Sequence, residues 1–405
     1  MAVGMDFISK LAIENTTKLV LLVADGLGGL HSGPGDETPL EYANTPNLDA
    51  LAHTASLGEH DPISPGVTPG SGPAHMGLFG YDPVEYIVER GALSAAGVDF
   101  PMEEGDIAAR ANFATVDSSG NVVDRRAGRI PTDKCADLCA LLEGRVQIEG
   151  VEVFVKPEKE HRAAVILRGK GLSGEVCDTD PQATGIPPAE PAATDGSDAA
   201  KRMAGIVRDF STQAAEVLKE EPRANYMLLR GLAAKPSLPS LCDLYKLHCC
   251  AVATYPMYRG LARLVGMDVV ETGTSIADEI ATVARSWTDH TYFFIHVKGT
   301  DSAGEDGDYD RRVRVIEEMD EALPALLDLK PDVLAVTGDH STPAILEAHS
   351  WHPVPLLLHS RYSRHSRANA FNESECARGN LGRIPAVHLM PLMLANGKRL
   401  QKFGA

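Results

Sequence analysis

Groups able to bind metal ions follow three apolar runs of the sequence. The runs share the β-branched character of buried parallel strands, and they are KLVLLVADG (18–26), YFFIHVKGTD (292–301) and DVLAVTGDH (332–340). The first ends in Asp25, the second in Asp301, and the third in Asp339 and His340. Ligands of open α/β sheets bind beyond the carboxyl ends of the strands, so these four groups are expected to converge. A single aspartate before glycine, as at Asp25, is also an ordinary turn residue.

Two further donors lie close to these strand ends. Glu305 follows Asp301 by four residues, and His349 follows His340 by nine. Carboxylate and imidazole ligands without cysteine suit Mn²⁺, Mg²⁺ or Zn²⁺. These two donors and the first four groups together are more ligands than one catalytic ion normally binds in a protein. The sequence therefore predicts two divalent cations, a pair that can acidify a hydroxyl and clamp a phosphoryl group.

Ser71 lies in a glycine- and proline-rich stretch, GVTPGSGPAHMGLFGYDP (66–83). The segment SGPAHMGLF resembles a helix start, with Ser71 at or near the N-cap and Pro73 in the first turn. A serine hydroxyl is a poor nucleophile unless a base or metal activates it. The backbone N–H groups of a helix start can also receive a phosphate. Ser71 is therefore the candidate nucleophile, and a capping serine in a loop is the alternative.

Arginines are concentrated in the middle of this acidic chain. VDRRAGRI places Arg125, Arg126 and Arg129 within five residues, and Arg110 precedes them. Further arginines of the same region are Arg162, Arg168 and Arg230. Guanidinium groups suit bidentate recognition of phosphate or carboxylate, whereas a solvated basic loop is the alternative. Lys298, in HVKGTD, points to the strand end of Asp301 and is a further candidate contact for substrate phosphate.

The order of the elements predicts an α/β protein with a mostly parallel sheet. Helical patterns at 44–55 and 309–329 alternate with the three apolar runs. The middle of the chain differs, with short alternating strands, a proline-rich stretch and a helix at about 198–219. We expect a metal-binding core formed by residues 1–104 and 246–405, interrupted by an α+β domain over residues 105–245.

The composition and net charge of the chain indicate which classes of molecule it can bind. The 405 residues include 38 Lys and Arg against 56 Asp and Glu, a net charge of −18 that disfavours nucleic acid and anionic membranes. The N-terminus lacks a basic region followed by an apolar stretch, and no run approaches the length that spans a bilayer. Seven scattered cysteines show no CxxC spacing. We expect a soluble cytoplasmic protein with reduced thiols and a small ligand. The sequence makes no prediction of oligomeric state.

The motifs resemble a known family in type and in order. They are VADGLGG, TPNLDALA, Ser71 ahead of HMGLFGYDP, ARANFATVD, DRRAGRI, HVKGTD, VTGDHSTP and HSWHPVP. In these features the chain is similar to the cofactor-independent (2,3-bisphosphoglycerate-independent) phosphoglycerate mutases, in their archaeal-type branch, within the alkaline phosphatase superfamily. The resemblance implies an alkaline-phosphatase-like core with an inserted phosphotransferase domain. It also implies an isomerase that interconverts 3- and 2-phosphoglycerate through a phosphoserine, without bisphosphoglycerate.

The resemblance also assigns roles. It implies that Ser71 is the nucleophile and that the ligands of one cation are Asp25, Ser71, Asp339 and His340. It implies ligands of a second cation at Asp301 and His349, with Mn²⁺ favoured and Mg²⁺ or Zn²⁺ possible, and a glycerate held by the arginines of the insertion while it reorients.

Two positions depart from the family pattern. Glu305 stands where relatives usually have histidine, in Asp-x-x-x-His, so its role as a ligand and the metal preference are open. Gly72 stands where relatives often have an acidic or amide residue. His75 is a candidate proton donor in its place, and a helix-surface histidine is the alternative.

Two other functions compete with the mutase. One keeps the metal site and Ser71 but changes the acceptor, as in a phosphatase or a homoserine-kinase-like phosphotransferase. The absence of a GxxxxGK[ST] loop disfavours a nucleotide-dependent enzyme. The other is a non-catalytic binding protein with a degraded second metal site, which Glu305 alone suggests.

Overall fold

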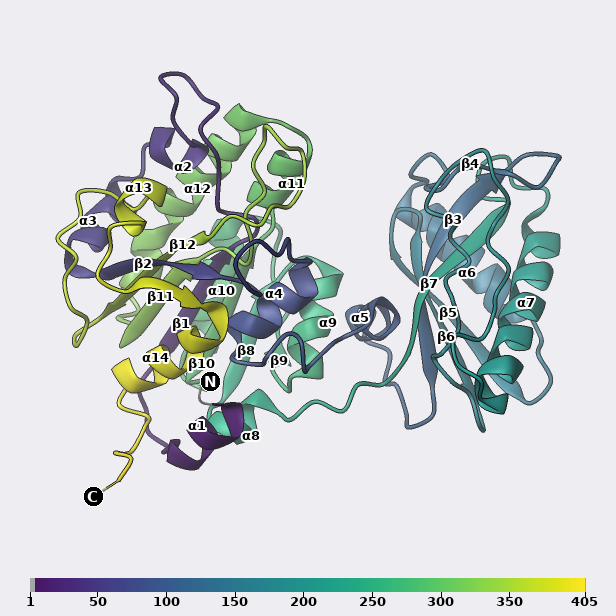
Figure 1. Cartoon of the computed structure of the whole chain (residues 1–405), viewed down its shortest axis with the longest axis horizontal. Helices are drawn as coiled ribbons and strands as arrows, with labels where there is room; N and C mark the ends of the chain where they lie inside the picture. Colours follow the sequence, from purple (N-terminus) through teal and green to yellow (C-terminus); the bar gives the residue numbers. More distant parts are fainter. Residues whose placement is uncertain (1–3, 405) are drawn as a thin grey trace. The chain divides into compact units, whose positions relative to one another are not determined.

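The chain folds into two compact units. The computed structural model describes residues 4–404 (Figure 1). The first unit contains both ends of the chain, up to Ile87 and from Leu238 onward, and the second spans Val88–Ser237. The expected limits of the core at residues 1 and 405 fall outside the described residues, and so do the first three residues of the N-terminal segment for which the sequence predicts no export signal.

The limits of the middle unit differ from the expected 105 and 245. Helix α5 (Arg90–Gly97) belongs to this unit because Ala95 packs against Ala108, Ala164 and Ile166. Helix α8 (Leu241–Tyr245) belongs instead to the first unit, where the Leu241 N–H donates to the Val265 carbonyl over 2.8 Å. The composition changes only at the first strand of the middle unit, so it does not mark the helix that precedes that strand.

A mostly parallel eight-stranded sheet forms the centre of the first unit. Its order is β13-β2-β12-β11-β1-β10-β8-β9. The strands are β1 (Leu19–Ala24), β2 (Ser56–Asp61), β8 (Cys249–Ala253), β9 (Asp268–Val269), β10 (Tyr292–Val297), β11 (Val333–Thr337), β12 (Val354–Ser360) and β13 (Gly382–Pro385). Only β12 runs antiparallel to its neighbours β11 and β2. The α/β class predicted from the apolar runs is confirmed.

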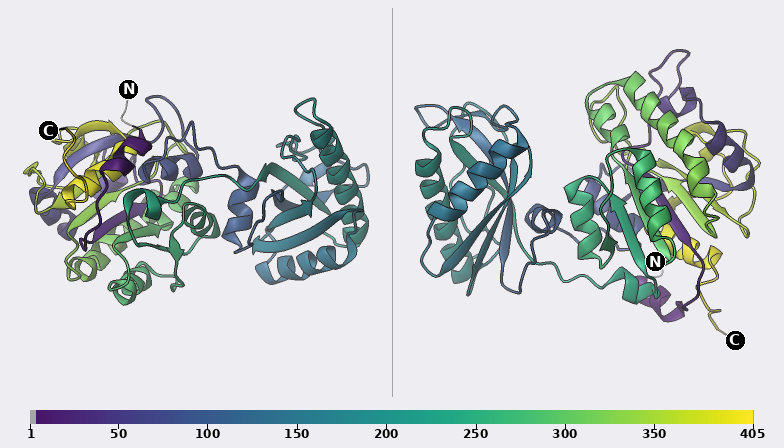
Figure 2. Two further views of the ribbon diagram at one scale, coloured as in Figure 1. Left: turned by 90° about the horizontal axis from the view of Figure 1, so that it is seen from below. Right: turned by 180° about the vertical axis from the view of Figure 1, so that it is seen from behind.

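Helices cover both faces of this sheet (Figures 1 and 2). Leu22 and Ile295 share one core with helices α3 (Pro46–Thr54), α10 (Ile276–Ser286) and α12 (Tyr309–Leu327). On the other face, the Phe294 ring lies 5.0 Å from that of Phe79 at the end of α4 (Ser71–Leu78). Helices α9 (Pro256–Leu264) and α14 (Leu389–Asn396) lie on the same side, since Tyr258 of α9 packs on His75 and Met390 of α14 lies beside Gly80. Besides α8, the other helices of the described part of the unit are α1 (Met5–Leu11), α2 (Pro39–Tyr42), α11 (Gly299–Glu305), α13 (Glu373–Cys376) and the 3-10 helix η1 (Ala386–His388).

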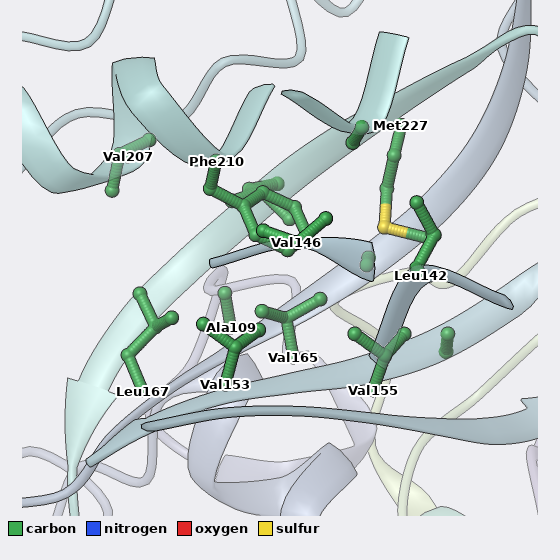
Figure 3. Close-up of a cluster of buried hydrophobic side chains, with 14 of the residues drawn as sticks. Ala109, Leu142, Val146, Val153, Val155, Val165, Leu167, Val207, Phe210 and Met227 are labelled. Carbon is green, nitrogen blue, oxygen red and sulfur yellow. The ribbon is translucent and has the colours of Figure 1, made fainter. Parts of the chain in front are cut away.

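The second unit is an antiparallel sheet with helices on both faces. Its strands are β3 (Ile107–Val116), β4 (Val122–Asp124), β5 (Val151–Lys159), β6 (Arg162–Gly169) and β7 (Tyr226–Ala234). Strand β3 pairs with β4, β6 and β7, and β5 lies outside β6. Alternate strand residues such as Val153 and Val165 pack on Leu142 of α6 (Thr132–Arg145) and Phe210 of α7 (Asp198–Leu218) (Figure 3). Helix α5 covers the opposite face.

The parallel registry brings the chemistry-bearing strand ends together. Strand β1 lies between β10 and β11, with Ala24 beside Val297 and Val23 beside Thr337. Asp25 therefore begins the loop after β1 at the same edge where β10 and β11 end. Within residues 4–404, no helix is both long and apolar enough to cross a bilayer.

Candidate active site

Ser71 meets the groups that follow β1 and β11. Its Oγ lies 3.2 Å from Nε2 of His340. The same nitrogen lies 3.1 Å from Oδ2 of Asp339 and 3.4 Å from Oδ1 of Asp25. Gly70 is the N-cap of α4 and Ser71 its first residue, and no side chain caps this helix. The Ser71 hydroxyl is therefore directed at His340 rather than used as a cap.

Asp25, Asp339 and His340 form a group of donors fit for a cation. One ligand atom from each lies within 4.8 Å of the others, and all three side chains are buried. Oδ1 of Asp25 and Oδ2 of Asp339 have no hydrogen-bond partner among the described residues. Buried carboxylate oxygens that accept no hydrogen bond, beside an imidazole, are the kind of donors that a divalent cation takes in proteins. The donor set therefore fits a divalent cation.

Neighbouring cations already favour the charged form of Asp25. Burial raises the pKa of Asp25 and Asp339 raises it further, but Lys298 and His296 outweigh both and lower it to about 2. Lys298 Nζ lies 2.9 Å from Oδ2 of Asp25 and also contacts Asp301. Tyr258 donates its hydroxyl to the same Asp25 oxygen. Lys298 thus lies between the strand ends that carry Asp25 and Asp301, and its contact with a substrate phosphate stays a prediction.

A second donor group shares His340. Asp301, His340 and His349 offer ligand atoms within 4.8 Å of one another. Nε2 of His349 lies 3.5 Å from Oδ1 of Asp301, and the rings of His340 and His349 stack 3.7 Å apart. Thr342 links the group because its Oγ1 lies 2.9 Å from both Asp301 Oδ1 and His340 Nδ1. Burial lowers the pKa of His340, but Asp339 and other carboxylates raise it to about 9.

Glu305 lies at the edge of the second group. Its Oε1 is 3.9 Å from Nε2 of His349, and 56% of its side chain is exposed. The neighbouring Asp306 is paired with Arg311 at 3.0 Å. Glu305 is therefore the carboxylate placed to approach a cation held by Asp301 and His349.

A cavity of about 350 Å³ in the second unit gathers the arginines. Its lining residues are Arg90, Arg110, Asn112, Arg125, Arg126, His161, Arg162, Gln182 and Arg230. Arg110, Arg125 and Arg126 are thus brought together. Arg129 is not among the lining residues and lies exposed in a turn with φ 53°. Arg168 also lies outside, paired with Asp106 at 2.8 Å.

The arginines of the cavity carry more positive charge than the neighbouring carboxylates neutralise. Arg125 holds Asp180 through two bonds of 2.8 Å, and Arg230 Nε lies 3.6 Å from the same carboxylate. Burial lowers the pKa of Arg230, and Arg90 lowers it further. Burial and then the neighbouring Arg162 lower the pKa of His161 to about 4, so this imidazole is neutral near pH 7. A small ligand with several negative charges fits such a cavity.

Comparison with known proteins shows to which family this chain is similar. The family model of the 2,3-bisphosphoglycerate-independent phosphoglycerate mutases matches residues 52–224. A relative from Thermotoga neapolitana, named a probable 2,3-bisphosphoglycerate-independent phosphoglycerate mutase, is 52% identical over 98% of each chain. A relative of the same name from Aquifex aeolicus is 50% identical over 99% of this chain and 100% of its own. The chain belongs to this mutase family.

Solved structures agree with the family assignment. A protein from Pyrococcus horikoshii superposes with a TM-score of 0.83 at 30% identity, covering 96% of this chain and 100% of its own. A cofactor-independent phosphoglycerate mutase from Thermoplasma acidophilum gives 0.71 at 30% identity, covering 94% and 100%. The family resemblance drawn from the motifs is confirmed.

Two residues around this mutase-family site were not predicted from the sequence. Tyr258 and His296 contact Asp25, with His296 Nε2 3.3 Å from Asp25 Oδ2. A histidine inside an otherwise apolar strand was the available signal for His296.

His75 is buried rather than on the helix surface, and its Nδ1 lies 2.8 Å from the Ser71 carbonyl and 3.2 Å from Asp339 Oδ2. These contacts orient His75 toward the Asp339 carboxylate, and Gly72 is also buried.

Proposed function

We propose that this protein interconverts 3-phosphoglycerate and 2-phosphoglycerate through a phosphoserine formed on Ser71 beside two divalent cations. The contact of 3.2 Å between Ser71 Oγ and His340 Nε2 carries the proposal. It places a hydroxyl at the edge of both donor groups in a chain whose relatives are named phosphoglycerate mutases. Neither bisphosphoglycerate nor a nucleotide enters the scheme.

Two sets of residues would hold the two cations. Asp25, Asp339 and His340, with the Ser71 oxygen, would hold one of them. Asp301 and His349 would hold the other, with Glu305 completing its ligands. Bound there, such cations lower the pKa of a hydroxyl and offset the charge of a transferring phosphoryl group. Oxygen and imidazole ligands favour Mn²⁺, with Mg²⁺ and Zn²⁺ as the other candidates.

The phosphoryl transfer runs in two balanced steps. Ser71 loses its hydroxyl proton as its Oγ attacks phosphorus, so an O–P bond to Ser71 forms while the ester O–P bond of the substrate breaks. The glycerate oxygen that leaves takes up a proton. In the second step the other glycerate hydroxyl loses a proton and attacks the phosphoserine, forming a new ester O–P bond. The O–P bond to Ser71 breaks, and Ser71 Oγ takes up a proton. Lys298 supplies positive charge beside both donor groups.

The arginine cavity gives the glycerate a place to be held. Arg110 and Arg126 are the candidates for its carboxylate, and the bidentate pair of Arg125 with Asp180 orders one wall. Retention of glycerate separates a mutase from a phosphatase, since water would otherwise accept the phosphoryl group from Ser71.

An enolase-coupled assay tests the proposal. Purified protein is loaded with Mn²⁺, Mg²⁺ or Zn²⁺ and given 3-phosphoglycerate, with inorganic phosphate measured in parallel. We expect formation of 2-phosphoglycerate with little release of phosphate, and loss of both in Ser71→Ala. Release of phosphate alone would show a phosphatase. Absence of turnover with all three metals would reject the mutase and favour a binding protein.

A further inference from the structure

Arg312 of α12 is completely buried in the first unit. Burial of a guanidinium is costly unless a carboxylate or several hydrogen bonds compensate for the lost water. Within residues 4–404, no carboxylate lies within ion-pair distance of Arg312. Burial lowers its pKa to about 10, which still leaves it charged near neutral pH. The carboxylates of Glu373, Asp301 and Asp25 favour the charged form from beyond ion-pair distance, whereas the direct hydrogen-bond partners of the guanidinium are neutral acceptors.

Those acceptors are backbone carbonyls of two loops that carry candidate metal ligands. Nη2 donates to the carbonyls of Leu27, over 2.6 Å, and Gly28, over 2.9 Å, and also to that of Gly26. Nη1 donates to the carbonyl of Thr342. Residues 26–28 directly follow Asp25, whereas Thr342 follows Asp339 and His340. One side chain thus ties the loop after β1 to the loop after β11.

The third ligand-bearing segment packs on the same guanidinium. Helix α11 carries Asp301 and Glu305, and its Gly304 lies against Arg312 and Thr342. A Cβ at Gly304 would come 2.7 Å from Arg312 Nη1 and 2.3 Å from the Thr342 carbonyl oxygen. The absence of a side chain at Gly304 is therefore what allows α11 to approach this closely. Arg312 contacts all three segments that supply donors.

We propose that Arg312 is a positioning residue that fixes the spacing of these three segments and thereby the affinity of the protein for divalent cations. The inference rests on the proposed two-cation site. Multidentate bonding to carbonyls suits this role because a planar guanidinium holds several acceptors at fixed angles. A flexible ammonium at the same place would keep the charge but fix fewer carbonyls.

Calorimetric titration of Mn²⁺ into the full, chelator-treated chain tests this role. We expect Arg312→Met to weaken Mn²⁺ binding by about 10–100-fold, the usual effect of losing a residue that orients metal ligands. Arg312→Lys should fall between Arg312→Met and the wild type. Arg314→Met, which changes an exposed arginine of the same helix, is the matched control and should bind Mn²⁺ like the wild type.

The outcomes separate this inference from the proposed function. A wild type that binds no Mn²⁺, Mg²⁺ or Zn²⁺ would reject the cation site itself. A cation-binding wild type beside a folded Arg312→Met of equal affinity would overturn only the role of Arg312. Circular dichroism reports folding of each variant. If Arg312→Met does not fold, Arg312→Lys and Gly304→Ala decide, because wild-type affinity in both would contradict the inference and weaker binding in both would support it.

Discussion

The Oγ of Ser71 lies 3.2 Å from Nε2 of His340, although 269 residues separate them in the chain. The start of α4 supplies the hydroxyl, and the loop after β11 supplies the imidazole. His340 belongs to both donor groups, so the hydroxyl is placed beside each of them. A serine that merely capped a helix would direct its oxygen at the backbone of its own first turn.

Ser71→Ala should abolish turnover while leaving cation binding largely in place. The variant loses the atom that accepts the phosphoryl group, whereas Asp25, Asp339 and His340 remain. We expect the rate of 2-phosphoglycerate formation to fall by at least about 10³-fold. Ser64→Ala, an exposed serine of the same segment, serves as control and should keep full activity. Turnover that survives in Ser71→Ala would contradict the phosphoserine.

Glu305→His should change which metal the second group prefers. Replacing a carboxylate by an imidazole makes the ligand set softer, so we expect the ratio of Zn²⁺ to Mn²⁺ affinity to rise by about tenfold. Competition titration against a chromogenic chelator measures this ratio. Asp306→Asn is the matched control because Asp306 is exposed and pairs with Arg311. If Glu305→His leaves stoichiometry and preference unchanged, Glu305 is not a ligand.

Arg126→Met should raise the KM for 3-phosphoglycerate by about 10–100-fold, the cost of losing a hydrogen bond between charged groups. Arg126 lines the arginine cavity. Arg168→Met is the control, since Arg168 lies outside the cavity and pairs with Asp106. The control should lower thermal stability and leave KM unchanged. Equal KM values in Arg126→Met and Arg168→Met would show that Arg126 does not bind the substrate in this cavity.

Sequence reasoning reached the strand ends but not the residues that support them. Asp25, Asp301 and Asp339 could be found because buried parallel strands have a strong apolar pattern and their carboxyl ends share one edge. Arg312 could not, since a charged residue on a helix rich in charges is expected to face solvent. Its burial depends on how two loops and helix α11 meet, which no local pattern encodes.

The arginine cavity shows the same limit. Arg125 and Arg126 are neighbours in the sequence, and the cavity contains both. Arg129 is part of the same run, but a turn with positive φ places it in solvent. Arg90 lines the cavity from α5, a helix whose small residues gave no sign that it belongs to the middle unit. The local density of arginine in the sequence indicated the chemistry of the ligand, but it did not indicate which arginines line the cavity.

Glu279→Gln should stabilise the first unit, and more so at pH 8 than at pH 5. Burial raises the pKa of Glu279 to about 8 from an ordinary 4.5, with a smaller contribution from Asp278. Between these values the folded state keeps a proton that the unfolded state releases, so wild-type stability falls as pH rises through this window and levels off above it. Glutamine has no proton to lose, and we expect the difference to reach on the order of 3 kcal/mol at pH 8. Urea unfolding followed by the fluorescence of Trp287 and Trp351, both in the first unit, measures it. Glu318→Gln, at an exposed position of α12, is the control, and an equal gain at pH 5 and pH 8 in Glu279→Gln would contradict the prediction.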